Sequence, residues 1–143
     1  MAETDTDPAA RLNAFLANTP YINFLGMRAE LAGDEMTAVL PFSDHLVGNA
    51  MLPALHGGVI GAFMEMTALA QLALAEPGLR LPKTIDVTVE YLRPGRAMPT
   101  FARADLRKVG RRIANVHVEA WQDRRDKPIA ALRGHFLLRQ DAG

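Results

Sequence analysis

The 143-residue sequence contains no cysteine. This absence excludes a disulfide framework, a zinc site built on cysteines and a thiol nucleophile. The 16 basic and 16 acidic side chains balance to a net charge of zero, so the basic surplus typical of proteins that bind nucleic acid or acidic membrane surfaces is missing. The histidines, His45, His56, His117 and His135, lack the spacing of metal ligands on a helix, and we expect no metal and no cofactor.

Signals for secretion and for a membrane span are also missing. The first eight residues are acidic and polar, unlike a secretory signal peptide. The most apolar stretch, residues 59–75, is shorter than the about 20 continuous apolar residues that cross a bilayer. We therefore expect a cytoplasmic protein with a disordered tail over residues 1–8 and a single domain over residues 9–143.

The predicted fold is organised around residues 56–75. Between positions 59 and 75 the only polar side chains are Glu65, Thr67 and Gln71. A helix that is apolar on every face is normally enclosed by protein. The sequence therefore predicts a core helix that ends near Pro77 and Gly78, with one carboxylate in its middle.

The other segments predict a helix over residues 9–17, helical or irregular structure over 21–26 and an antiparallel sheet. The expected strands are residues 27–31, 36–42, 84–92, 100–109, 112–122 and 129–139, with a loop over 43–55. In the first long strand Ile85, Val87, Val89 and Tyr91 alternate with polar residues, among them Thr84. Short links between strands suit antiparallel pairing, so we predict an α+β fold with one curled antiparallel sheet wrapped around the central helix. Enclosing that helix on all sides calls for a second sheet or a second subunit, which favours a dimer.

Glu65 needs a chemical explanation, because an ionised carboxylate buried without partners costs several kcal/mol. It either faces a wet edge of the helix or pairs with a buried arginine, or it acts as a base or nucleophile in a cleft. His56, Gly57 and Gly58 open the same helix, where free backbone N–H groups and the helix dipole stabilise negative charge. Amide donors together with a carboxylate indicate acyl transfer.

The spacing of these groups predicts how the site is assembled. Seven residues separate Gly58 from Glu65, about 10 Å along a helix at about 1.5 Å per residue. One carbonyl carbon needs both groups within about 3–3.5 Å. A single helix cannot supply both, whereas an antiparallel second copy can. We therefore predict a dimer with composite sites.

Four motifs match one known family: Leu-His-Gly-Gly-Val at 55–59, an acid at Glu65, Tyr-Leu-Arg-Pro-Gly at 91–95 and Val-Gly-Arg-Arg at 109–112. Through them the sequence resembles the hot-dog-fold acyl-CoA thioesterases of the phenylacetyl-CoA type, over about residues 20–139. The resemblance implies that the amide of Gly57 or Gly58, with His56 nearby, polarises the thioester carbonyl. It also implies that Glu65 of the partner subunit acts as nucleophile or general base.

The resemblance suggests two further residues near the reacting atoms. Relatives often have an asparagine six residues before the histidine, where this sequence has Ala50, so a one-residue bulge would be needed for Asn49 to orient a water or the carbonyl. Thr84 matches a Ser or Thr that helps to hold the water; an ordinary exposed strand threonine is the alternative.

The implied partner is an acyl-CoA, and seven basic side chains against one acid between residues 93 and 112 suit its phosphates. For any single arginine a solvated strand face is the alternative, and the charged run at residues 123–128 is interpreted as a solvated turn. The resemblance implies substrate contacts from Tyr91, Arg93, Pro94, Gly95, Arg96, Gly110, Arg111, Arg112 and His135.

The functional prediction is hydrolysis of an aryl or short- to medium-chain acyl-CoA by a homodimer at minimum, with a homotetramer favoured and no nucleic-acid or membrane partner. Two alternatives stay open. One is a hot-dog enoyl-CoA hydratase or dehydratase, which His56 at the very start of the helix disfavours. The other is a non-catalytic acyl-CoA-binding protein.

Overall fold

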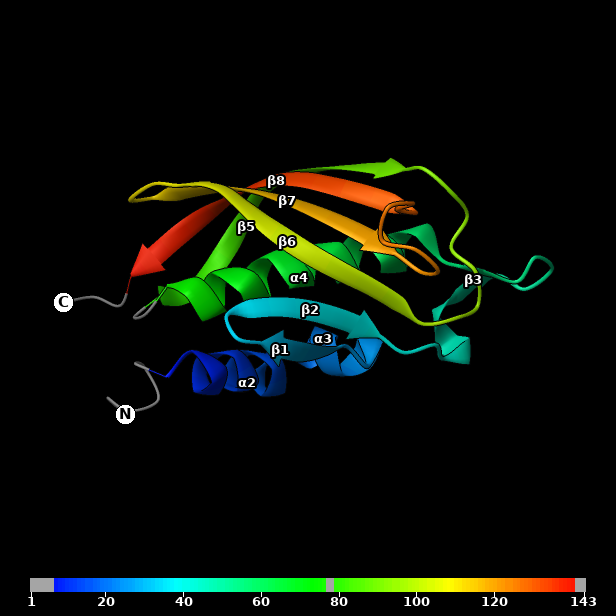
Figure 1. Ribbon diagram of the computed structural model, residues 1–143, viewed down its shortest axis with the longest axis horizontal. Coiled ribbons are helices and arrows are strands. Elements are labelled where there is room, and N and C mark those ends of the chain that lie inside the picture. Colours follow the sequence, from blue (N-terminus) through cyan, green and yellow to red (C-terminus); the bar gives the residue numbers. More distant parts are fainter. Residues whose placement is uncertain (1–6, 77–78, 141–143) are drawn as a thin grey trace.

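A six-stranded antiparallel sheet curls over one long helix in the computed structural model, which describes residues 7–76 and 79–140 (Figure 1). The elements in chain order are α2 (Pro8–Asn18), α3 (Pro20–Leu25), β1 (Arg28–Ala32), β2 (Glu35–Leu40), the 3-10 turn η1 (Asp44–Leu46), β3 (Val47–Asn49), β4 (Ala54–Leu55), α4 (Gly57–Ala75), β5 (Leu79–Tyr91), β6 (Thr100–Val109), β7 (Ile113–Trp121) and β8 (Ala130–Gln140). The predicted α+β architecture, an antiparallel sheet around a central helix, is confirmed.

The strand order in the sheet is β1-β2-β6-β7-β8-β5, so β1 and β5 are its two edges. The inner face packs on α4, and α2 covers another side of that helix, as Figure 1 shows. Alternate residues of β7, namely Ala114, Val116, Val118 and Ala120, are buried against α4, as their spacing predicts. Their neighbours in sequence point to the outer face of the sheet.

A side chain caps each end of α4. Nδ1 of His56, the N-cap residue, accepts a hydrogen bond from the backbone N–H of Gly58 at 2.9 Å. At the other end Arg11 of α2 donates to the carbonyl oxygens of Ala73 and Leu74 at 3.1 and 2.6 Å. These bonds fasten α2 to the last turn of α4, where carbonyl groups lack helical partners.

By length and composition alone α4 is sufficient to cross a membrane, so the sequence argument from its length was wrong. Its packing against the sheet and α2 is that of a core helix. The helix is not enclosed on every side, however. One stripe, formed by Gly58, Gly61, Ala62, Glu65 and Met66, is exposed or only half-buried.

Strand β5 differs most from the prediction. It begins at Leu79 rather than at Thr84, and its pairing with β8 shifts register between Thr84 and Asp86. Such a bulge moves the alternation of faces by one residue, so Thr84 faces α4 instead of sharing the outer face with Asp86. Because β5 is an edge strand, its apolar residues are incompletely covered: Ile85 is 50% exposed and Val87 38%.

Smaller differences lie in the first third of the chain. The loop predicted over residues 43–55 contains η1 and the short paired strands β3 and β4. The first helix begins at Pro8, inside the predicted tail, because the Asp7 carboxylate caps it by accepting the N–H of Ala9. Residues 1–6 of that tail lie outside the described residues.

Candidate functional site at the start and middle of the core helix

The start of α4 leaves one backbone donor free. The N–H of Gly58 is taken by His56 Nδ1, and the N–H groups of Val59 and Ile60 both donate to the His56 carbonyl oxygen. Among the described residues no acceptor is found for the N–H of Gly57. Of the two glycine amides predicted to hold an oxyanion, that of Gly57 is therefore the one without an acceptor in the described part of the chain.

Tyr91 fixes the position of this helix start. Its hydroxyl donates to the carbonyl oxygen of Gly57 at 2.7 Å. A Cβ atom added at Gly57 or at Gly61 would lie 3.4 Å from Tyr91, so the ring packs on both glycines. The sequence analysis missed Gly61, although a glycine within an apolar helix is a signal of close packing. The end of β5 is thus held against the first turns of α4.

Glu65 lies in the uncovered stripe of α4 and is half-buried. The hydroxyl of Thr84 donates to its Oε2 at 2.6 Å, a short, charge-assisted bond that orients the carboxylate. Within residues 7–76 and 79–140 no arginine or lysine forms an ion pair with Glu65. The alternative of a carboxylate neutralised by a buried arginine is therefore not what the structure contains.

The free amide and the carboxylate are separated along the helix. Glu65 lies eight positions after Gly57, about 12 Å at about 1.5 Å per residue. This is too far for both groups of one chain to reach one carbonyl carbon.

A hollow of about 320 Å³ adjoins the helix start. It is lined by Leu55, Gly57 and Ile60 on one side, and by residues 91–95 on the other. Gly95 allows this close contact, because a Cβ there would lie 2.7 Å from Cδ1 of Ile60, whose side chain would have to shift. The structure thus brings the predicted residues Tyr91, Arg93, Pro94 and Gly95 to the hollow beside the free amide.

Other predicted site residues do not line this hollow within one chain. Asn49 is exposed in the β3–β4 hairpin, and its Oδ1 accepts the N–H of Met51 at 2.9 Å. His135 is on the outer face of the sheet, where Nδ1 contacts Asp86 Oδ1 at 2.9 Å. Arg96 is near the hollow, but its guanidinium pairs with Asp123.

Gly110, Arg111 and Arg112 form the turn between β6 and β7, at the opposite end of the sheet from Arg93 (Figure 1). The nine residues of β7 span the sheet between these ends, about 30 Å at about 3.3 Å per residue. One chain therefore cannot bring Arg93 and Arg112 to the same small region.

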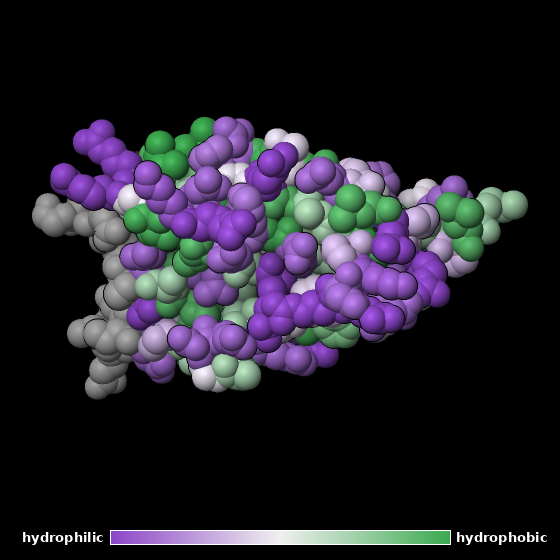
Figure 2. Space-filling model, turned by 45° about the horizontal axis from the view of Figure 1, so that its top comes forward, coloured by the Kyte–Doolittle hydropathy of each residue, from purple (hydrophilic) through white to green (hydrophobic). Residues whose placement is uncertain are grey.

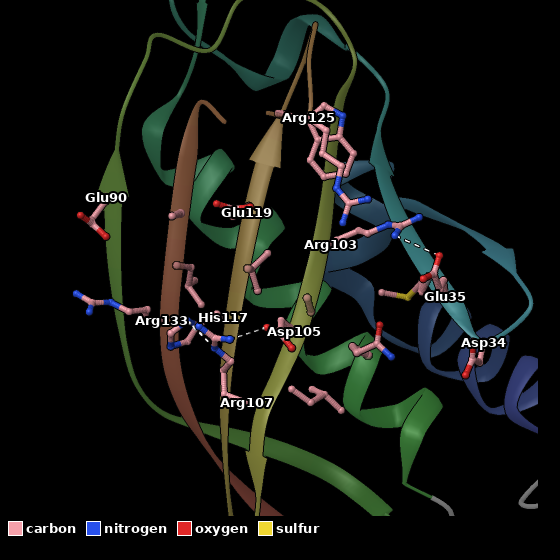
Figure 3. A pocket seen from close by; sticks show the side chains of 18 residues that line it. Asp34, Glu35, Glu90, Arg103, Asp105, Arg107, His117, Glu119, Arg125 and Arg133 are labelled. Carbon is pink, nitrogen blue, oxygen red and sulfur yellow. Dashed lines mark hydrogen bonds and ion pairs between the residues drawn. The ribbon is translucent and has the colours of Figure 1, made fainter. Parts of the chain in front are cut away.

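A larger hollow, of about 870 Å³, lies mainly over the outer face, which Figure 2 shows as predominantly hydrophilic. Figure 3 shows its charged side chains on the strands, with α4 behind the sheet. Several of these charges pair with each other: Arg107 with Asp105 at 3.1 Å, and Arg103 with Glu35 at 3.3 Å. Glu65 is not among the lining residues, and we assign no reaction to this hollow.

Comparison with known proteins agrees with this geometry. Residues 52–129 match the family model of the thioesterase superfamily. The medium/long-chain acyl-CoA thioesterase YigI of Escherichia coli is 33% identical in an alignment of 120 positions, which covers 73% of this chain and 77% of YigI.

Two solved structures are similar over nearly the whole chain. A protein from Chromobacterium violaceum has a TM-score of 0.76 at 36% identity, covering 99% of this chain and 100% of its own. The BH2602 protein from Bacillus halodurans, solved with CoA, has a TM-score of 0.76 at 16% identity, covering 95% of this chain and 93% of its own. At that identity the second likeness concerns the fold alone.

Proposed function

This chain belongs to the thioesterase superfamily and is a thioester hydrolase, and from that premise we propose that it hydrolyses acyl-CoA in composite sites between two copies of the chain. The observation that supports the composite site is the position of Glu65. It lies on the uncovered stripe of α4 and is held by Thr84 of β5, an edge strand whose outer edge has no partner strand in the sheet.

A second copy placed against this edge would cover both features. Pairing of β5 with its symmetry mate would continue the sheet, and an unpaired edge with exposed apolar residues such as Ile85 and Val87 favours such pairing. A two-fold axis would set the two α4 helices antiparallel. Gly57 of one chain would then face Glu65 of the other.

In this arrangement the roles of the residues follow from their contacts. The N–H of Gly57 donates to the thioester carbonyl oxygen as it gains negative charge. Glu65 of the second copy takes a proton from a water, whose oxygen attacks the carbonyl carbon. The C–S bond then breaks, and the products are the free acid and CoA. Alternatively Glu65 attacks the carbon itself, giving an anhydride that water hydrolyses.

The residues around the reacting groups act by positioning. Thr84 orients the Glu65 carboxylate, and His56 and Tyr91 fix the first turn of α4. Asn49 keeps its proposed role as an orienting group, which requires its side-chain oxygen to release the N–H of Met51.

The same two-fold axis would also bring the basic turn at residues 110–112 close to a site. Antiparallel helices would bring residues 110–112 of one chain toward the helix start of the other, where Arg93 lies. Both could then contact one CoA, as the resemblance implies. Association of two dimers into a tetramer stays a prediction.

For the acyl group we propose an aryl or a short- to medium-chain aliphatic group, with medium-chain as the first candidate. The YigI relative, a medium/long-chain acyl-CoA thioesterase, favours the aliphatic choice.

A panel of phenylacetyl-, short-chain and medium-chain acyl-CoAs, with detection of free thiol, tests the proposal. Release of CoA from at least one of them is expected. Hydration of an enoyl-CoA without thiol release would instead indicate a hydratase. Tight binding of all substrates with no turnover would indicate a binding protein.

A further inference from the structure

A second hollow, of about 440 Å³, adjoins the one at the helix start. Arg93 and Pro94 line both. Its other basic residues are Arg96, from the segment after β5, and Arg124 and Lys127, from the turn between β7 and β8. The sequence analysis interpreted that turn as solvated and without function. The structure instead places it across a hollow from the end of the Tyr-Leu-Arg-Pro-Gly motif.

The backbone on both sides of this hollow is fixed by hydrogen bonds. The N–H groups of Leu92 and Arg93 both donate to the carbonyl oxygen of Ile129, at 2.8 and 3.0 Å. Within the turn, the N–H of Lys127 donates to the carbonyl oxygen of Arg124 at 3.0 Å.

Gln122, buried beneath the hollow, ties the two sides together. Its side chain accepts the N–H of Arg96 at 3.0 Å and donates to the Arg96 carbonyl oxygen at 2.9 Å. The same amide nitrogen donates to the hydroxyl of Thr100 at 3.1 Å. The basic side chains therefore extend from backbone positions that the fold determines.

The charge around the hollow is positive. Arg124 gives two N–H groups to Asp126, and Arg96 pairs with Asp123, so two of the four cations have carboxylate partners. Arg93 and Lys127 have none among the described residues. Four cations against two carboxylates leave a surplus of two positive charges, which favours a ligand with at least two negative charges.

We propose that this hollow binds phosphate groups, and that those groups belong to the CoA part of the substrate. The inference rests on the proposed function and adds Lys127 and Arg124 as substrate-binding residues. Because Arg93 and Pro94 line both hollows, a ligand that extends from the free amide of Gly57 past Arg93 would reach the basic turn. In an acyl-CoA the pantetheine arm joins the thioester to the phosphates. This order matches the apolar surface beside Gly57 and the basic surface at the turn. The carboxylates occupy only some of the N–H donors of each arginine. The other donors are available to phosphate oxygens.

The test compares Lys127→Ala and Arg124→Ala with Arg125→Ala. Arg125 is a matched control, since it lies in the same turn but stacks over the Trp121 ring and lines the outer-face hollow instead (Figure 3). Each protein is assayed with an acyl-CoA and with the N-acetylcysteamine thioester of the same acid, which has no phosphate. Binding of CoA is measured separately by calorimetry, and competition by ADP, by 3′-dephospho-CoA and by inorganic phosphate identifies the source of the phosphate.

For Lys127→Ala the ratio of KM for the acyl-CoA to KM for the truncated thioester should rise about three- to tenfold, as expected for a partly exposed charged contact. The Kd for CoA should rise by a similar factor. Arg125→Ala should change neither by more than about twofold. In the wild type ADP should compete with CoA, and inorganic phosphate should compete only weakly.

An unchanged KM ratio and Kd in Lys127→Ala and Arg124→Ala would overturn the proposal, as would an equal change in Arg125→Ala. Competition by inorganic phosphate as strong as by ADP would assign the hollow to free phosphate and would also overturn it. If the wild type hydrolyses acyl-CoA while these results are obtained, only the phosphate site fails. If the wild type hydrolyses no thioester, the proposed function fails, and the calorimetric Kd values alone decide on the hollow.

Discussion

Replacement of Gly57 by proline removes one hydrogen-bond donor and leaves the helix in place. Gly57 is the first residue of α4, and its N–H has no partner among the described residues. Proline is well tolerated at this position, because its fixed φ suits the helix and its missing N–H would have no helical acceptor. His56 before it has φ −63° and ψ 132°, the extended conformation that a residue before proline needs.

The structure also provides a matched control, Gly57→Ala. A Cβ at this position lies no closer than 3.4 Å to the Tyr91 ring, an ordinary contact. Alanine therefore controls for the added Cβ and keeps the N–H, whereas proline adds Cβ, Cγ and Cδ, with Cδ in place of the amide hydrogen. If this N–H stabilises the oxyanion, proline should lower kcat by about 10²-fold to 10³-fold, the usual effect of losing one such donor. Alanine should stay within about threefold of the wild type.

The assay is steady-state thiol release from an acyl-CoA that the wild type hydrolyses, with thermal unfolding of each variant to verify the fold. The comparison that matters is proline against alanine. If both variants unfold near the wild-type temperature and have equal kcat, then the amide of Gly57 does not stabilise the transition state. The choice of Gly57 over Gly58 as the donor would then be wrong.

Three other substitutions test neighbouring parts of the account. Glu65→Gln keeps the shape but removes the base, and should lower kcat by about 10²-fold or more with binding largely retained; equal turnover would end its catalytic assignment. Thr84→Val removes the hydroxyl on Glu65 and should lower kcat about tenfold with little change in KM, whereas Thr88→Val on the exposed outer face should not; equal kcat in the two would refute the positioning role. Gln122→Leu leaves buried groups of residues 96–100 without partners and should lower the free energy of unfolding by about 1–3 kcal/mol, measured by denaturant titration; an unchanged midpoint and slope would show that this side chain does not hold the segment.

The long helix and its acid were predictable because their signals are local. A run with three polar side chains in 17 positions identifies a core helix, and Glu65 is conspicuous within it. The alternation in β7 likewise determines which of its residues meet α4, without knowledge of any partner strand.

The contacts between distant segments were not predictable in the same way. Thr84 faces Glu65 because of a bulge, which depends on the pairing of β5 with β8 rather than on the local sequence. The choice between Gly57 and Gly58 depends on the side-chain conformation of His56. Lys127 belongs to a charged run that is typical of a solvated turn, and only the topology of the sheet places it opposite Arg93.

Composite sites are the central claim, and complementation between two inactive variants tests them most directly. Glu65→Gln and Gly57→Pro, each nearly inactive alone, are coexpressed so that mixed dimers form. In a mixed dimer one site combines the intact Gly57 of one chain with the intact Glu65 of the other. With random pairing, the mixture should recover about a quarter of the wild-type activity, since half of the dimers are mixed and each has one complete site. Activity no higher than the average of the two variants alone would contradict the claim, because sites contained within one chain cannot be repaired by mixing.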